Sequence, residues 1–211
     1  MKKKETIIKK YIEFELITGK SPVSVFEFMH HFKATEKDFY THFNSLEQLR
    51  KNILETHLVT VFETLDGDEN YHSFSAREKS LALFYTLFEY WKDYRSYLLV
   101  KYQHVENWKN ISNDWDGFMQ QLEARMENIL LSAKQEEEVV DRPVIGKHYA
   151  KGFKLVFTYL LRVWFKDESK DFETTDAAIE KSLNLAFDML GKGPLDSMLD
   201  FGRFALKTKV L

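Results

Sequence analysis

The sequence predicts an all-α protein. Only three of its 211 residues are proline, and Pro22, Pro143 and Pro194 each stand where a helix should begin. Proline is tolerated in the first turn of a helix but breaks its interior, so this placement leaves long uninterrupted stretches. Within these stretches apolar residues recur at intervals of three and four, which is the period of an amphipathic helix.

The first 50 residues predict one longer helix followed by a cluster of helix starts. The longer helix ends near Gly19, and its apolar residues at helical spacing are Ile7, Ile8, Tyr11, Ile12 and Leu16. Residues 24–49 then contain three capping boxes, in which a hydroxyl side chain and an acid or amide three positions later accept from backbone amides. The pairs are Ser24 with Glu27, Thr35 with Asp38, and Ser45 with Gln48. Two short helices and a longer one are the layout of a helix-turn-helix with its supporting helix.

The rest of the chain continues the helical pattern. A stripe of apolar residues predicts a fourth helix from about 45 to 65, and DGDENYHSF at 66–74 is expected to be a loop. Ser75 and Glu78 form a fourth capping box, which opens the next helix. The later helices are predicted over about 75–92, 94–109, 113–137, 144–166 and 173–190, with a short amphipathic segment at the C-terminus.

Charge is distributed unevenly along the chain. Residues 1–57 carry 10 Lys and Arg against 8 Asp and Glu, whereas the whole chain has a formal charge of −3. Much of the basic character comes from Lys2–Lys4 and Lys9–Lys10, which are either an arm that contacts nucleic-acid phosphates or a solvated tail. A basic head on an acidic body is compatible with a nucleic-acid reader.

Several functional classes are not expected. The chain has no cysteine, which excludes disulfides, thiolate zinc sites and cysteine nucleophiles. His30 and His31 are the only close histidine pair, and adjacent helical residues point in different directions, so no metal site, cofactor or enzyme activity is predicted. The longest apolar run, at 155–165, is too short to span a bilayer, so we expect a cytoplasmic protein without stable membrane insertion.

Residues 24–49 resemble the DNA-binding head of TetR-family transcriptional regulators. The most specific stretch is FYTHFNSLEQL at 39–49, and with the preceding helix the resemblance covers about the first 57 residues. It implies a three-helix helix-turn-helix domain at 1–50 and a helical ligand-binding and dimerisation domain at 51–211. The implied partners are a double-stranded DNA operator, a small apolar or amphipathic effector and a second copy of the chain.

The resemblance also indicates which residues face DNA. They are Ser24, Lys33, Thr35, Glu36, Lys37, Tyr40, Thr41 and His42. Two of them depart from the family pattern. Lys33 stands where glycine is usual, so its backbone should be left-handed or adjusted. Glu36 places a carboxylate on the recognition helix, where it repels phosphates unless it accepts from a cytosine amino group.

Two sets of apolar residues suggest the functions of the body. Residues 84–118 are rich in aromatic side chains, which form either an ordinary core or a pocket for a mostly apolar ligand. The expected pocket residues are Tyr85, Phe88, Trp91, Tyr102, Trp115 and Phe118. The helices at 144–166 and 173–190 have apolar faces wider than one core requires, which is typical of an interface. The expected dimer residues are Phe157, Leu161, Trp164, Leu183 and Phe187.

A second, shorter resemblance leaves an alternative open. WFKDESKDFETTDAAIEKSL at 164–183 is similar to a segment of the TetR-fold accessory proteins of ubiquinone biosynthesis, which bind isoprenoid lipids. The same residues are also explained as a loop followed by a helix N-cap. The sequence therefore favours a ligand-responsive DNA-binding regulator, a repressor. The alternative is a lipid-binding accessory protein whose DNA-binding head has lost its function.

Overall fold

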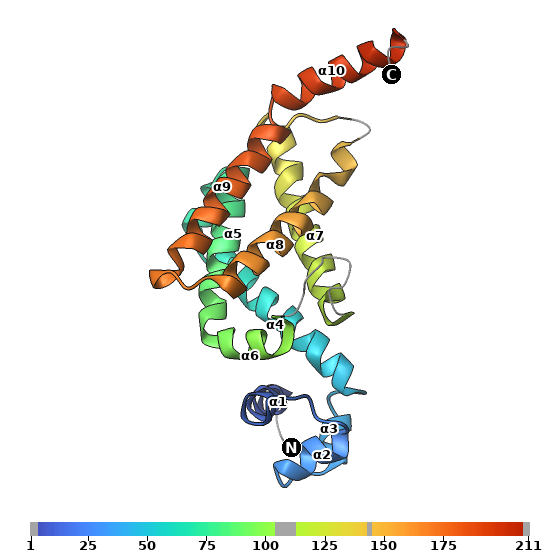
Figure 1. The fold of residues 1–211 in the computed structure, drawn as a ribbon, viewed down its shortest axis with the longest axis vertical. Coiled ribbons are helices and arrows are strands. Elements are labelled where there is room, and N and C mark those ends of the chain that lie inside the picture. The colour runs from blue at the N-terminus through green and yellow to red at the C-terminus, as the bar shows by residue number, and fades with distance from the viewer. Residues whose placement is uncertain (1–3, 104–112, 143–144, 209–211) are drawn as a thin grey trace. The chain divides into compact units, whose positions relative to one another are not determined.

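The computed structural model describes residues 4–103, 113–142 and 145–208 (Figure 1). Within these ranges no residue lies in a β-strand, and the predicted all-α class is confirmed. The helices are α1 (Lys4–Thr18), α2 (Val25–His31), α3 (Glu36–Tyr40), α4 (Leu46–Asp66), α5 (Ala76–Trp91), α6 (Arg95–Tyr102), α7 (Asp116–Gln135), α8 (Tyr149–Lys166), α9 (Glu173–Leu190) and α10 (Pro194–Lys207).

The observed helix bounds differ from the predicted ones mainly where short 3₁₀ turns intervene. The predicted loop at 66–74 contains such a turn at Glu69–Ser73, because the Asp68 side chain accepts from the Asn70 amide at 2.9 Å. Two predicted helices open as 3₁₀ turns, at Asn113–Trp115 before α7 and at Gly146–His148 before α8. The helix expected over 94–109 is described as far as Tyr102, and residues 104–112 lie outside the described ranges.

The hydroxyl groups of all four predicted capping boxes accept the expected amide hydrogen bonds. At Thr35 and Ser75 the box is reciprocal, since Asp38 and Glu78 accept from the amides of the capping residues. The other two acceptors reach one residue further back, so that Glu27 accepts from Val23 and Gln48 from Asn44, both at 2.6 Å. The hydroxyl bonds predicted from the sequence thus form at all four helix starts, whereas the predicted return bond to the capping residue forms at two of them.

The chain divides into two compact units. Residues 1–64 and 86–121 form the first unit, and residues 65–85 and 122–211 form the second. Aromatic rings dominate the core of the first unit near the N-terminus. The ring centroids of Tyr11 of α1 and Phe28 of α2 are 5.5 Å apart, and those of Phe28 and Phe39 of α3 are 6.2 Å apart. The predicted head at 1–50 therefore lies within a single unit.

Helices α8 and α9 pack side by side in the second unit (Figure 1). Phe153 of α8 meets Phe187 of α9, with ring centroids 5.8 Å apart, and both side chains are buried. Among the described residues, no helix is both long and apolar enough to cross a membrane.

Candidate nucleic-acid interface

Helices α2 and α3 are joined by a tight turn at Lys33. Its φ angle is 51°, which is the left-handed conformation that the departure from glycine predicted. The turn is held by two backbone hydrogen bonds, from Lys33 N to His30 O at 3.0 Å and from Ala34 N to Met29 O at 2.9 Å. The helix-turn-helix geometry thus forms without glycine, with a lysine under backbone strain at its apex.

Helix α3 presents polar residues outward from one buried anchor. Phe39 is fully buried, whereas Glu36, Lys37, Tyr40 and Thr41 are exposed. The Tyr40 side chain is 52% exposed. The remaining predicted contacts are Ser24, Lys33 and Thr35, which are exposed, and His42, which is half-buried.

Hydroxyl groups in this segment are already engaged locally. Thr35 Oγ1 donates to Asp38 Oδ2 at 2.9 Å, and Thr41 Oγ1 donates to Lys37 O at 2.8 Å. Asp38 is therefore explained by its capping role. Glu36 remains exposed, and it forms no ion pair with a residue that the structure describes.

Two lysines of the basic N-terminal cluster lie over aromatic rings of the head. The Lys10 ammonium is 4.3 Å from the centroid of Phe32, and the Lys4 ammonium is 5.6 Å from that of Phe43. Such cation–π contacts hold positive charge beside α2 and α3. Residues 1–3 lie outside the described ranges.

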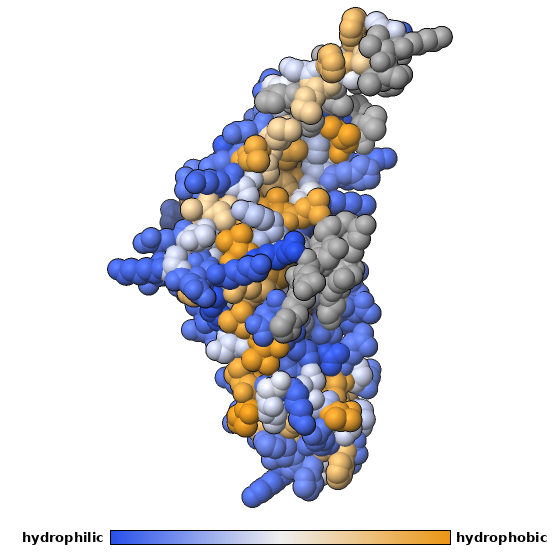
Figure 2. All heavy atoms as spheres, in the orientation of Figure 1, coloured by the Kyte–Doolittle hydropathy of each residue, from blue (hydrophilic) through white to orange (hydrophobic). Residues whose placement is uncertain are grey.

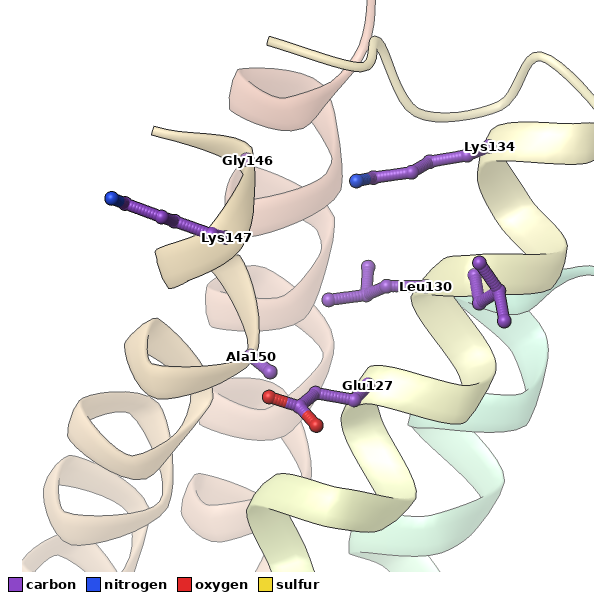
Figure 3. Close-up of a pocket in the computed structure, with 7 residues that line it drawn as sticks. Glu127, Leu130, Lys134, Gly146, Lys147 and Ala150 are labelled. Carbon is purple, nitrogen blue, oxygen red and sulfur yellow. The ribbon is translucent and has the colours of Figure 1, made fainter. Parts of the chain in front are cut away.

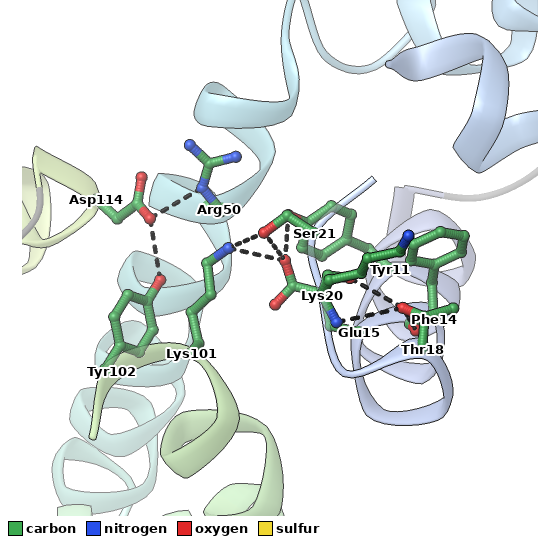
Figure 4. A network of polar contacts seen from close by, with 10 residues as sticks. All are labelled: Tyr11, Phe14, Glu15, Thr18, Lys20, Ser21, Arg50, Lys101, Tyr102 and Asp114. Carbon is green, nitrogen blue, oxygen red and sulfur yellow. Dashed lines mark hydrogen bonds and ion pairs between the residues drawn. The ribbon is translucent and has the colours of Figure 1, made fainter. Parts of the chain in front are cut away.

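Helix α1 is tied to α6 through a buried carboxylate (Figure 4). Glu15 is only 1% exposed, and its Oε1 accepts from Tyr11 Oη at 2.6 Å, Ser21 Oγ at 2.8 Å and Lys101 Nζ at 2.9 Å. Burial and the neighbouring Glu15 raise the pKa of Tyr11 far above its usual range, so its hydroxyl remains a donor. Because a buried charge needs a partner, Lys101 and Glu15 constrain each other strongly.

The next residue of α6 makes a second polar junction in the same unit. Tyr102 Oη donates to Asp114 Oδ2 at 3.2 Å, and the same oxygen accepts from Arg50 Nε of α4 at 2.9 Å (Figure 4). The Tyr102 ring also packs edge-on against Trp115, with centroids 5.1 Å apart. Two consecutive residues at the C-terminal end of α6 therefore contact α1 and the aromatic cluster, and Asp114 links the second of them to Arg50 of α4.

Five of the six predicted pocket residues gather in the first unit. The ring centroid of Trp91 lies 5.6 Å from that of Phe118 and 5.9 Å from that of Trp115. Phe88 packs against Trp91, and Tyr102 packs against Trp115. All five are buried. Tyr85 belongs to the second unit, where its hydroxyl donates to Asp176 O at 3.3 Å.

Two buried polar groups in the first unit were not singled out from the sequence. The hydroxyl of Tyr97, whose ring meets that of Tyr102 at 6.5 Å, has no hydrogen-bond partner among the described residues. The same is true of Nδ1 of His57, which packs against the rings of Tyr90 and Tyr94. Burial lowers the pKa of His57 to about 4. Periodicity predicts that such residues are buried, but it does not predict which polar atoms lack partners.

Three hollows in the described residues are lined by other side chains. One of about 480 Å³ lies on the head between α1 and α2, beside Phe26 and His30. A second, of about 240 Å³, lies between α7 and the start of α8, where Leu130 and Lys134 point toward the segment that carries Gly146 and Ala150 (Figure 3). The third, of about 540 Å³, lies on the outer face of α8 and α9. The pocket expected at the aromatic cluster stays a prediction.

The five predicted dimer residues form the chain's own core between α8 and α9. Each of Phe157, Leu161, Trp164, Leu183 and Phe187 is at most 2% exposed. The exposed face of these helices instead carries Leu155 and Tyr159 of α8 and Leu185 of α9, beside the 540 Å³ hollow. Helical spacing predicted the wide apolar faces but did not distinguish the buried side from the exposed side, because both sides of each helix are apolar. The interface itself stays a prediction.

The segment that resembles the lipid-binding accessory proteins forms a loop and a helix cap. Asp167 accepts hydrogen bonds from the amides and hydroxyls of Ser169 and Thr175, at 2.5 to 2.9 Å. These bonds hold the pKa of Asp167 at about 2, against the opposing effect of burial. The matching residues thus have a local structural role before α9.

Comparison with known proteins places most of the body in a known family. The family model described as "Tetracyclin repressor-like, C-terminal domain" matches residues 79–205, more than half of the chain. A search of curated proteins finds no match. Among the described residues, no group of three or more His, Cys, Asp or Glu side chains is arranged to hold a metal ion.

Proposed function

Because the chain belongs to the tetracycline repressor-like family, we propose that it is a ligand-responsive, DNA-binding transcriptional regulator that acts as a homodimeric repressor in the cytoplasm. The observation that carries this proposal is the head. There a capped α2, a left-handed turn at Lys33 and a capped α3 form a helix-turn-helix with Lys37, Tyr40 and Thr41 on its outer side. This arrangement supports insertion of α3 into a major groove.

The proposed DNA contacts divide into two kinds. Lys33 and Lys37 supply charge for phosphates, which contributes affinity that depends on salt but little on sequence. Tyr40, Thr41 and His42 follow on the same segment and are the candidates for base edges. Glu36 repels phosphates, so it contributes favourably only by accepting from a base, most simply a cytosine amino group.

The proposed effector site is the aromatic cluster of the first unit. Tyr97 supports this assignment, because its buried hydroxyl has no partner among the described residues and a ligand that accepts its hydrogen bond would stabilise it. The effector is then a mostly apolar molecule with at least one acceptor. Its binding beside Tyr102 and Trp115 would disturb the junctions of α6 with Asp114, Arg50 and Glu15, and so favour a different placement of the head.

The proposed dimer uses the outward faces of α8 and α9. A two-fold interface presents the same patch on both copies, and the apolar strip of Leu155, Tyr159 and Leu185 is available for such pairing. Two heads in a dimer match two half-sites about one helical turn of DNA apart.

Selection from random oligonucleotides at about 0.15 M salt tests the proposal, because specific binding at physiological salt is what a regulator requires. We expect an enriched palindromic sequence that the wild-type protein binds as a dimer. Lys37→Ala should weaken that binding, and the control Lys79→Ala removes a cation from α5 in the second unit. No enrichment in the selection would contradict the proposal.

The lipid-binding alternative is favoured by one observation, the exposed carboxylate of Glu36 on α3. It predicts no enrichment in the same selection and a lipid retained by the purified protein in native mass spectrometry. The two proposals therefore give opposite results in the same pair of measurements.

A further inference from the structure

Helix α10 exposes three large apolar side chains on one side. Met198, Phe201 and Phe204 are spaced by three residues, and they are 63%, 71% and 63% exposed. Figure 2 shows apolar side chains along this helix on the viewed face. A cluster of this kind on a soluble protein is typical of an interaction surface, since burying it releases the water that it orders.

The start of α10 is held firmly in the second unit. Arg142 is buried, and its guanidinium donates to both carboxylate oxygens of Asp196 at 2.7 and 2.8 Å. It also donates to Leu190 O at 3.1 Å, to Gly191 O at 2.9 Å and to Tyr149 Oη at 2.8 Å. One side chain thus joins the start of α8, the end of α9 and the first turn of α10. Helix α10 continues beyond the end of α9 (Figure 1), and its side chains Met198, Phe201 and Phe204 are exposed.

The charges of α10 favour a protein as the occupant of this surface. The sequence of α10 contains two acidic and two basic residues, so its composition has no excess of positive charge. Helices that lie on a membrane surface usually have a polar face rich in Lys and Arg, which attracts anionic lipids. A lipid surface therefore matches the composition of α10 less well than an apolar protein surface does.

The area available for a dimer identifies the protein as a second copy of this chain. If each fully exposed large side chain offers about 200 Å², the strip on α8 and α9 offers only about 350 Å² and the three residues of α10 about 400 Å². A stable interface buries about 800 Å² of each partner, and in homodimers about 65% of that area, or about 500 Å², is apolar. The strip alone falls short of this apolar area, and the two surfaces together exceed it.

We propose that α10 is a dimerisation arm, whose face of Met198, Phe201 and Phe204 packs on a second copy of the chain beside the α8–α9 strip. This inference rests on the homodimer of the proposed function. Both surfaces belong to the same unit, and Arg142 fixes the start of the arm relative to α8 and α9. Each copy then extends its arm over the other, which enlarges the interface beyond the helix pair.

Sedimentation velocity over a range of protein concentrations tests the arm. We expect wild-type dimers and, for the double variant Phe201→Ser, Phe204→Ser, a dissociation constant raised at least about a hundredfold by the loss of four buried rings per dimer. The matched control is Phe26→Ser, because Phe26 is 61% exposed but lies on the head. Unchanged far-UV circular dichroism should show that the double variant is folded.

A label gives a second readout. The chain has no cysteine, so Met198→Cys introduces a single thiol for a polarity-sensitive dye. Its emission should shift to the blue as the concentration rises through the dimerisation range.

The outcomes separate the arm from the dimer itself. A double variant that dimerises as tightly as wild type would overturn the arm and leave the proposed homodimer intact. A monomeric wild type would overturn both. Cosedimentation of wild type with phosphatidylserine vesicles, lost in the double variant while the dimer is unchanged, would assign α10 to a membrane instead.

Discussion

Lys101 on α6 donates to Glu15 on α1 at 2.9 Å, and the acceptor is a carboxylate that is almost completely buried. The two residues are 86 positions apart in the sequence, so only the tertiary fold brings them together. Tyr11 and Ser21 donate to the same oxygen, Oε1, whereas Oε2 is buried without a partner among the described residues. The contact ties the first helix of the head to α6, whose next residue meets the aromatic cluster.

Removal of the Lys101 charge should destabilise the first unit. Lys101→Met leaves Glu15 buried without its cation, which typically lowers the free energy of unfolding by about 3 kcal/mol. The double variant Lys101→Met, Glu15→Gln should recover much of this loss, because no unpaired charge remains. Urea unfolding of the three proteins measures the difference, and an equal loss in the single and double variants would assign the effect to packing.

Replacement of Lys33 by glycine should separate fold stability from DNA affinity. The lysine holds a φ of 51°, so Lys33→Gly should relieve strain and raise the free energy of unfolding by about 1 kcal/mol. It should also weaken DNA binding and reduce the slope of log K against log salt by about one unit, since one phosphate contact is lost. Asparagine also tolerates the left-handed backbone, so Lys33→Asn shows the effect of losing the charge alone. An unchanged salt slope would remove Lys33 from the interface.

Acid should destabilise the protein through His57. Its pKa falls from an ordinary 6.5 to about 4 because burial disfavours the charged imidazolium. Between pH 6.5 and about 4, the His57 imidazole therefore binds a proton in the unfolded chain but stays neutral in the folded chain. This contribution to stability is complete above pH 6.5 and is lost progressively as the pH falls to about 4, amounting to about 3 kcal/mol.

The variant His57→Gln tests the assignment, because glutamine does not titrate. Its free energy of unfolding should depend less on pH than that of wild type between pH 6.5 and 4. The exposed His72 offers the control, and His72→Gln should follow the wild-type curve. If both variants follow wild type, another group causes the acid sensitivity.

Two tyrosine hydroxyls on the same unit should respond oppositely to removal. The buried hydroxyl of Tyr97 has no partner in the part of the chain that the structure describes, so Tyr97→Phe should leave stability unchanged or raise it. Tyr11 donates to Glu15 at 2.6 Å, so Tyr11→Phe should lower the free energy of unfolding by about 1 to 3 kcal/mol. Thermal unfolding compares the two. Equal losses would show that the Tyr97 hydroxyl has a partner in the folded protein.

The sequence by itself determined the features that depend on neighbouring residues. The helix starts at Thr35 and Ser75 follow from side chains that accept hydrogen bonds from amides three residues away. These interactions are local, so the pattern of residue types is sufficient to predict them. The all-α class follows in the same way from helical periodicity.

The tertiary structure alone decided which surfaces and polar groups are available. Phe157, Leu161 and Leu183 were expected at an interface, but they fill the space between α8 and α9 and leave Leu155 and Leu185 outside. Glu15 was not singled out from the sequence, and in the structure it is the buried centre of a junction between α1 and α6. Burial and charge pairing depend on contacts between residues far apart in the chain. A periodic pattern of apolar residues does not specify which distant side chains pack against or pair with a given residue.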